Sequence, residues 1–173
     1  MKPVQSSIYT LCLGLFFTLI TSFSVHAQNN FAHINTQQLL SEMPEVIAVN
    51  KELENLEKQY TTELDSSVKE YQTKAQNYAA DAENQSDLIN QQRSRELEGM
   101  QQNIAEFRQT ASLELQKKQG ELMNPLIEKA RGAIEAVALA QGYDYVLDSS
   151  PGGSVIVSNG KDLMADVKRE LGF

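Results

Sequence analysis

The sequence has 173 residues, a net charge of −8 and a single cysteine, Cys12. This length gives room for one modest domain, or for one domain with a long appendage, rather than for two full-sized cores. The acidic balance argues against nucleic acid as the main partner, because phosphate binding needs a surplus of Lys and Arg. Aromatic residues are only 7% of the chain, so base-stacking surfaces are not expected either.

Residues 1–27 have the pattern of a secretory signal peptide. Lys2 precedes an uncharged apolar run of 13 residues, and the small residues Val25 and Ala27 suit cleavage after Ala27. The run is shorter than the about 20 residues that a membrane-spanning helix needs, although an uncleaved anchor remains the alternative. We therefore expect export through a cleaved signal to the periplasm. The exported chain would lose Cys12 and would contain no disulfide.

Residues 45–124 predict a long helical arm. They contain no proline and are rich in Glu, Gln, Lys, Leu and Ala, which are good helix formers. Apolar side chains recur at steps of three and four, the spacing of an amphipathic coiled-coil stripe. The stripe is interrupted at residues 81–87, where Asn84 and Ser86 are suited to capping a new helix. We predict a turn there and an antiparallel hairpin; one unbroken helix is the alternative.

The segments on either side of the arm have a different pattern. Phe31–Asn35 alternates like a short strand, and Thr36 is predicted to cap a short helical turn that ends at Pro44. Beyond the arm, Pro125 predicts that a new helix starts with proline in its first turn. Gly142 is a suitable C-terminal cap for that helix.

The C-terminal segment predicts two more strands and a last helix. The strands are expected at residues 143–148 and 154–158, joined by a turn, and the helix at residues 163–171. We expect the first strand to pair with these two. The predicted fold class is α+β, with a small β-sheet body formed by residues 28–44 and 125–173 and a long antiparallel coiled-coil hairpin arm formed by residues 45–124.

Three segments together resemble the Skp/OmpH family of periplasmic chaperones. They are Ile34–Glu45 (INTQQLLSEMPE), Ala133–Ala138 leading into GYDYVLD at residues 142–148, and Asp162–Leu171. The resemblance implies a homotrimer, with a small intersubunit β-body and three hairpin arms that enclose a cavity. It also implies that the protein holds unfolded outer-membrane β-barrel proteins in transit without ATP.

Two features depart from the family pattern. The best-known members are basic, whereas the predicted arm tip here carries Asp81, Glu83 and Asp87. The sequence therefore does not decide whether the arm tip makes peripheral contact with a membrane. Met164 stands where the family often has Thr, which weakens capping of the last helix.

Candidate contact residues follow from the arm stripe and from the strands. Long arms offer many shallow apolar contacts to varied partners. The candidates for client binding are Leu53, Leu56, Tyr60, Leu64, Tyr71, Tyr78, Met100, Ile104 and Phe107. The candidates for body core or trimer contact are Phe31, Ile34, Tyr143, Tyr145, Leu147, Val155, Ile156 and Val157. A stripe at this spacing is more often a helix–helix seam than a client surface, although one edge can pack the hairpin while the other faces a client.

The sequence contains no recognisable catalytic, metal or cofactor site. His33 is the only histidine after residue 27, and no Cys/His set has metal-ligand spacing. No glycine-rich phosphate loop is present. We therefore expect a binding protein rather than an enzyme, with no cofactor. A structural or adaptor coiled coil of the cell envelope is the alternative to a holdase, and the breadth of clients would separate the two.

Overall fold

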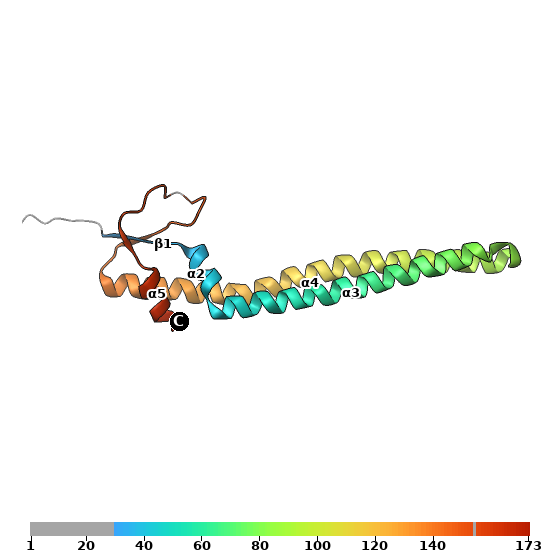
Figure 1. The fold of residues 1–173 in the computed structure, drawn as a ribbon, viewed down its shortest axis with the longest axis horizontal. Coiled ribbons are helices and arrows are strands. Elements are labelled where there is room, and N and C mark those ends of the chain that lie inside the picture. Colours follow the sequence, from blue (N-terminus) through green and yellow to red (C-terminus); the bar gives the residue numbers. More distant parts are fainter. Residues whose placement is uncertain (1–29, 154) are drawn as a thin grey trace, which may run out of the picture. The chain divides into compact units, whose positions relative to one another are not determined.

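The computed structural model describes residues 30–153 and 155–173, and Phe31–Phe173 forms one compact unit (Figure 1). The predicted signal peptide lies outside the described residues. The unit is largely helical with one small sheet. Its elements in chain order are β1 (Phe31–Ile34), α2 (Thr36–Glu42), α3 (Pro44–Ala80), the 3₁₀ turn η2 (Ala82–Asn84), α4 (Asp87–Gln141), β2 (Tyr145–Asp148), β3 (Lys161–Asp162) and α5 (Met164–Leu171).

The sheet has the strand order β2-β1-β3, and both pairings are parallel. Phe31 lies opposite Tyr145, and Ala32 lies opposite Lys161. The N-terminal strand therefore joins two segments from the other end of the chain, as predicted. The second and third strands are not neighbours in the sheet, because β2 and β3 lie on opposite edges of β1.

The strand predicted at residues 154–158 is wrong. Val155–Ser158 lie outside the strands, and the side chain of Ile156 is 96% exposed. The third strand forms at Lys161–Asp162 because the next residue, Leu163, is fully buried. Its backbone N–H donates to the carbonyl oxygen of His33 over 3.0 Å. Burial of Leu163 thus selects which segment pairs with β1.

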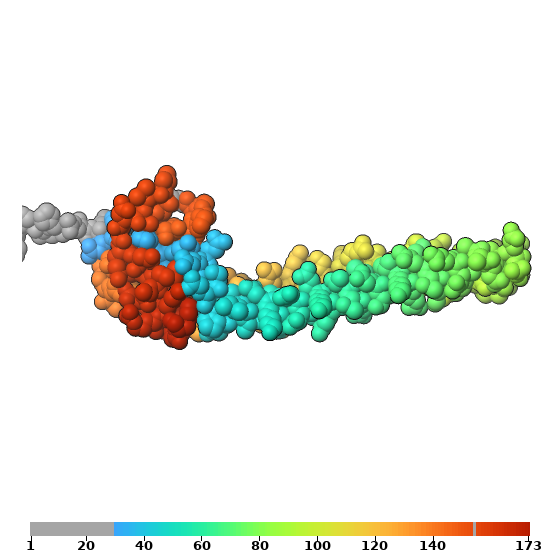
Figure 2. Space-filling view, viewed as in Figure 1, coloured from blue at the N-terminus to red at the C-terminus, as the bar shows by residue number. Residues whose placement is uncertain are grey.

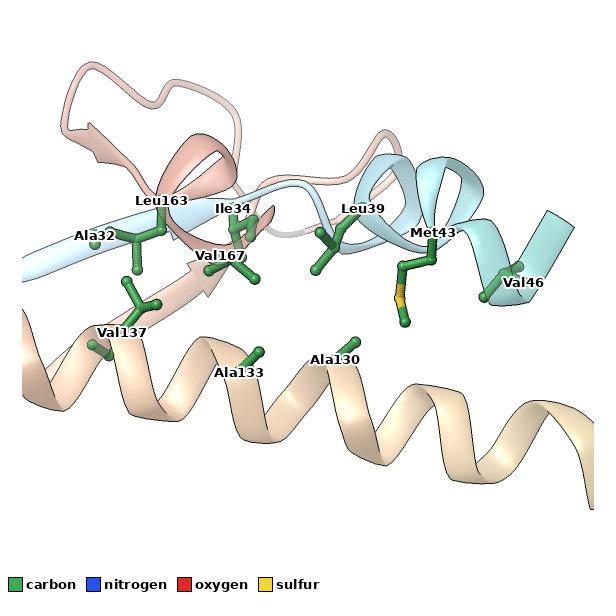
Figure 3. Packing of buried hydrophobic residues seen from close by; sticks show 11 residues of the cluster. Ala32, Ile34, Leu39, Met43, Val46, Ala130, Ala133, Val137, Leu163 and Val167 are labelled. Atoms are coloured by element: carbon green, nitrogen blue, oxygen red, sulfur yellow. The ribbon is translucent and has the colours of Figure 1, made fainter. Parts of the chain in front are cut away.

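A compact hydrophobic core lies between the sheet and the C-terminal part of α4 (Figure 3). Strand β1 directs alternate side chains inward, while α4 presents small residues that let the other elements approach closely. The short helices α2 and α5 close the core. Its members are Ala32, Ile34, Leu39, Met43, Val46, Ala130, Ala133, Val137, Ala138, Leu163 and Val167.

The junction of β1 and α2 is fixed by a polar cluster at the carboxyl ends of two strands. The cap of α2 is Asn35 and not Thr36, because the Asn35 side chain accepts a hydrogen bond from the Gln38 backbone N–H over 2.9 Å. Thr36 instead donates its hydroxyl to Asp148 at the end of β2, over 2.7 Å. Ser150 also donates its hydroxyl to Asp148, over 2.6 Å. These bonds tie the N-terminal segment to the C-terminal one.

Helices α3 and α4 form an antiparallel hairpin (Figure 1). Helix α3 has 37 residues, which corresponds to about 55 Å. It ends at Ala80, directly before the predicted break at residues 81–87, and the Ser86 hydroxyl accepts from the Ile89 N–H at the start of α4. The predicted turn is confirmed, so a single unbroken helix is excluded. Of the two predicted caps, Ser86 performs the role, while Asn84 lies in η2.

Helix α4 runs through Pro125 without a break, so the predicted restart there is wrong. A proline inside a helix removes one hydrogen bond and costs about 3 kcal/mol. Helix α4 packs against α3 before Pro125 and against the body after it, and packing on both sides outweighs that local cost. The predicted cap at Gly142 is confirmed: its φ is +74°, and the next N–H, of Tyr143, donates to Ala138 O over 2.9 Å.

Candidate functional site

The nine client-binding candidates all lie half-buried along the α3–α4 hairpin. The side chains from α3 are Leu53, Leu56, Tyr60, Leu64, Tyr71 and Tyr78, and those from α4 are Met100, Ile104 and Phe107. A pair of helices has no third layer to cover its seam, so each of these side chains keeps part of its surface open. Their role in client binding remains a prediction, but their partial exposure is compatible with both packing and binding.

Tyr60 and Phe107 make the clearest aromatic contact across the hairpin. Their ring centroids are 6.0 Å apart and the rings are nearly perpendicular, which is a favourable edge-to-face arrangement. The Tyr60 hydroxyl donates to Glu114 Oε2 over 2.6 Å, and this bond raises the pKa of Tyr60. A shallow hollow of about 300 Å³ beside the pair is lined by Leu64 and Leu115 among others. This part of the hairpin therefore combines an apolar contact between two rings with a polar contact between a hydroxyl and a carboxylate.

The other two candidate tyrosines also have polar partners on α4. Tyr71 accepts a hydrogen bond from the side-chain amide of Gln101. Tyr78 donates its hydroxyl to Glu96 Oε2 over 2.6 Å, which raises the pKa of Tyr78. Each tyrosine therefore spans the seam, with its ring half-buried and its hydroxyl satisfied.

The polar partners of the tyrosines were missed by the sequence analysis. Each stands directly beside an apolar stripe residue: Glu96 before Leu97, Gln101 after Met100, and Glu114 before Leu115. Positions that flank a coiled-coil stripe commonly form contacts between helices. That spacing could have identified them, since a tyrosine hydroxyl reaches beyond the apolar stripe.

A second open surface lies on the sheet. Phe31 and Tyr145 stack with their ring centroids 5.2 Å apart, and both rings are about half exposed. Leu147 lies on the same strand face as Tyr145, two residues further on, and is also exposed. Of the body candidates, Ile34 lies in the core and Tyr143 packs partly against it. Outside the strands, Val155 is half-buried, whereas Ile156 and Val157 are exposed.

An apolar groove of about 690 Å³ lies between α2, α4 and β2. Its apolar lining includes Leu40, Ile134, Leu139 and Val146. The Leu139 side chain is 84% exposed, which is unusual for a large aliphatic residue. The body therefore combines a closed core with two apolar surfaces that are open in the single chain.

The described residues contain no group of three or more His, Cys, Asp or Glu side chains arranged to hold a metal ion. None of the helices among residues 30–153 and 155–173 combines the length and apolar character that a membrane crossing requires.

Comparisons with known proteins agree on one family. The Skp chaperone of Pectobacterium atrosepticum is 27% identical over 91% of this chain and 94% of its own length. The Skp chaperone of Yersinia enterocolitica is 27% identical over 92% of this chain and 94% of its own length. The crystal structure of an OmpH-like protein from Caulobacter crescentus superposes with a TM-score of 0.74 at 16% identity, covering 84% of this chain and 85% of that one, and thus shares the fold. The family model described as "Outer membrane protein (OmpH-like)" matches residues 30–171, and the chain therefore belongs to the Skp/OmpH family.

Proposed function

We propose that this protein is an ATP-independent holdase of the periplasm that binds unfolded outer-membrane proteins in a cavity between helical arms. The observation that carries the proposal is the continuous half-buried seam of the α3–α4 hairpin. A holdase without nucleotide must bind at many weak points and release its client when the client reaches a more stable state. A long series of partly exposed apolar and aromatic side chains is suited to that task. The relatives named as Skp chaperones support the same function.

A homotrimer is the assembly that we propose. The stacked rings of Phe31 and Tyr145, the exposed Leu147 and the groove beside Leu139 are apolar surfaces on the body. Large exposed apolar surfaces usually mark contact sites. If three copies share these surfaces, the arms of the three hairpins are held around a common space. Sedimentation at several protein concentrations should give a trimer, and a stable monomer would contradict the cavity.

The holdase proposal is tested by the number of clients protected. The purified protein should keep several unrelated unfolded β-barrel proteins from aggregating without ATP. Ile104→Gln should weaken that protection several-fold, because it places an amide on the proposed contact surface. Leu113→Gln is the matched control: Leu113 lies on the same helix, is exposed and is not a candidate.

Two outcomes would count against the holdase. Protection of no unfolded client would favour an envelope adaptor that binds one folded partner. Equal loss of protection in Ile104→Gln and Leu113→Gln would mean that the seam has no special role. Sedimentation should show that both variants still form the trimer, so that a loss of protection is not caused by a loss of assembly.

A further inference from the structure

The end of the hairpin remote from the body is held together differently from the rest. Midway along the hairpin, the seam contains large apolar side chains such as Phe107. At the remote end, the ring of Tyr78 is half-buried, but the other half-buried positions include Asn90 and Arg93 of α4 and the small residue Ala75 of α3. Since apolar stabilisation scales with the area buried, this end gains less from it than the middle of the hairpin.

Polar contacts connect the helices there instead. Glu96 of α4 accepts hydrogen bonds from two residues of α3: Lys74 Nζ over 2.7 Å and the Tyr78 hydroxyl over 2.6 Å. Arg93 pairs with Asp81 over 3.0 Å, and its guanidinium lies 4.7 Å from the centre of the Tyr78 ring. One guanidinium nitrogen of Arg93 is buried without a hydrogen-bond partner in the described structure. Its position over an aromatic face accounts for that, because the face attracts the cation.

These side chains are only partly shielded from water. The Asp81 and Glu96 side chains are each 42% exposed, and Lys74 is 36% exposed. Ion pairs at such exposure contribute little individually and are screened by salt. A helix pair that depends on them opens more readily than one that depends on buried apolar area.

We propose that Lys74, Tyr78, Asp81, Arg93 and Glu96 form a polar clasp, which lets the end of the hairpin open while the part around Tyr60 and Phe107 stays closed. Opening of the clasp would uncover Leu97 and Met100 of the seam. If the protein is a holdase, as proposed above, the opened arm would offer a client more apolar contact area. This consequence alone depends on the proposed function. The clasp itself is independent of any client.

Hydrogen exchange of the purified protein without a client tests the clasp. Glu96→Ala removes the acceptor of two bonds and should speed amide exchange at residues 74–80 and 93–100 about 3- to 10-fold. Exchange at residues 104–118 should stay unchanged. Raising the salt concentration should also speed exchange at residues 74–80 and 93–100 in the unmodified protein, because salt screens the ion pairs. The same increase in salt should speed exchange less in Glu96→Ala, which has already lost one of the pairs.

Glu98→Ala is the matched control. Glu98 is exposed on the same helix and joins none of the ion pairs between described residues. Because both variants replace Glu by Ala, they change the charge and the helix propensity equally. Tyr78→Phe, which removes only a hydroxyl, should speed exchange at the same residues by a smaller factor. Equal exchange in Glu96→Ala and Glu98→Ala, or equal acceleration along the whole hairpin in Glu96→Ala, would overturn the proposal. Neither result depends on whether the protein is a holdase.

Discussion

The body and the hairpin use the same kinds of residue in opposite ways. In the body, aliphatic side chains from β1, α2, α4 and α5 meet from several sides, and Leu39, Met43, Leu163 and Val167 are completely covered. In the hairpin, leucines and aromatic rings at comparable spacing remain half-buried, because only two helices share them. Figure 2 shows the body as a thicker mass of chain and the hairpin as a slender extension.

The difference is one of geometry rather than composition. A side chain is closed off from water when three or more elements converge on it, whereas a helix pair closes only the middle of its seam. The body can therefore supply stability while the hairpin keeps apolar surface available. This division predicts that the same substitution has different consequences in the two regions.

The largest difference is expected for leucine truncation. Leu39→Ala in the body should lower the free energy of unfolding by about 2–5 kcal/mol, the range for a fully buried leucine. Leu64→Ala in the hairpin should lower it by about 1 kcal/mol, because that side chain is only half-buried. Denaturant unfolding at one fixed protein concentration measures both. Similar losses for the two variants would remove the distinction between the regions.

A smaller effect is expected from the polar cluster that joins the ends of the body. Burial alone would raise the pKa of Asp148, but hydrogen bonds from Ser150 and Thr36 outweigh it and lower the pKa to about 2. A carboxyl with a depressed folded-state pKa stabilises the fold above its unfolded pKa, and this contribution is lost as the pH falls toward 2.

Asp148→Asn should therefore lower stability at pH 7 by about 1 kcal/mol, after allowance for its solvent exposure. The loss relative to the unmodified protein should shrink as the pH falls from about 4 toward 2. Thermal unfolding across that range measures it, with Asp65→Asn on the exposed side of α3 as the control. A penalty for Asp148→Asn that is independent of pH would show that the carboxylate charge does not fix this junction.

The smallest effect is expected for the tyrosine bonds of the hairpin. Tyr60→Phe keeps the ring against Phe107 and removes only the hydroxyl that donates to Glu114. The expected cost is the smallest of the three, because the bond is exposed to water. A double-mutant cycle with Glu114→Ala should give a small favourable coupling energy between the two side chains. A coupling energy of zero would mean that the hydroxyl contributes nothing to the seam.

Local signals in the sequence predicted the hairpin well. The polar interruption after Ala80 and the hydroxyl of Ser86 marked the turn, and the three-four spacing marked the seam. These features depend on residues that are close in sequence. The prediction that a helix restarts at Pro125 was wrong because packing on both sides of this residue, and not its own local preference, decides that α4 continues.

The sheet was harder to predict because its pairings join residues more than a hundred positions apart. The sequence at residues 154–158 favours a strand by composition, yet the strand forms at Lys161–Asp162, where Leu163 can enter the core. Likewise, the tyrosines of the seam were recognised, whereas their partners Glu96, Gln101 and Glu114 were not. Those contacts depend on the alignment of α3 with α4, which the turn sets and which composition does not show.

Hydrogen exchange with and without an unfolded outer-membrane β-barrel protein tests most directly the proposal that the hairpin binds the client while the body stays closed. We expect slower exchange along residues 53–107 when the client is bound, and little change at Leu39 and Val137 in the core. Slower exchange confined to the body, with the hairpin unchanged, would contradict it.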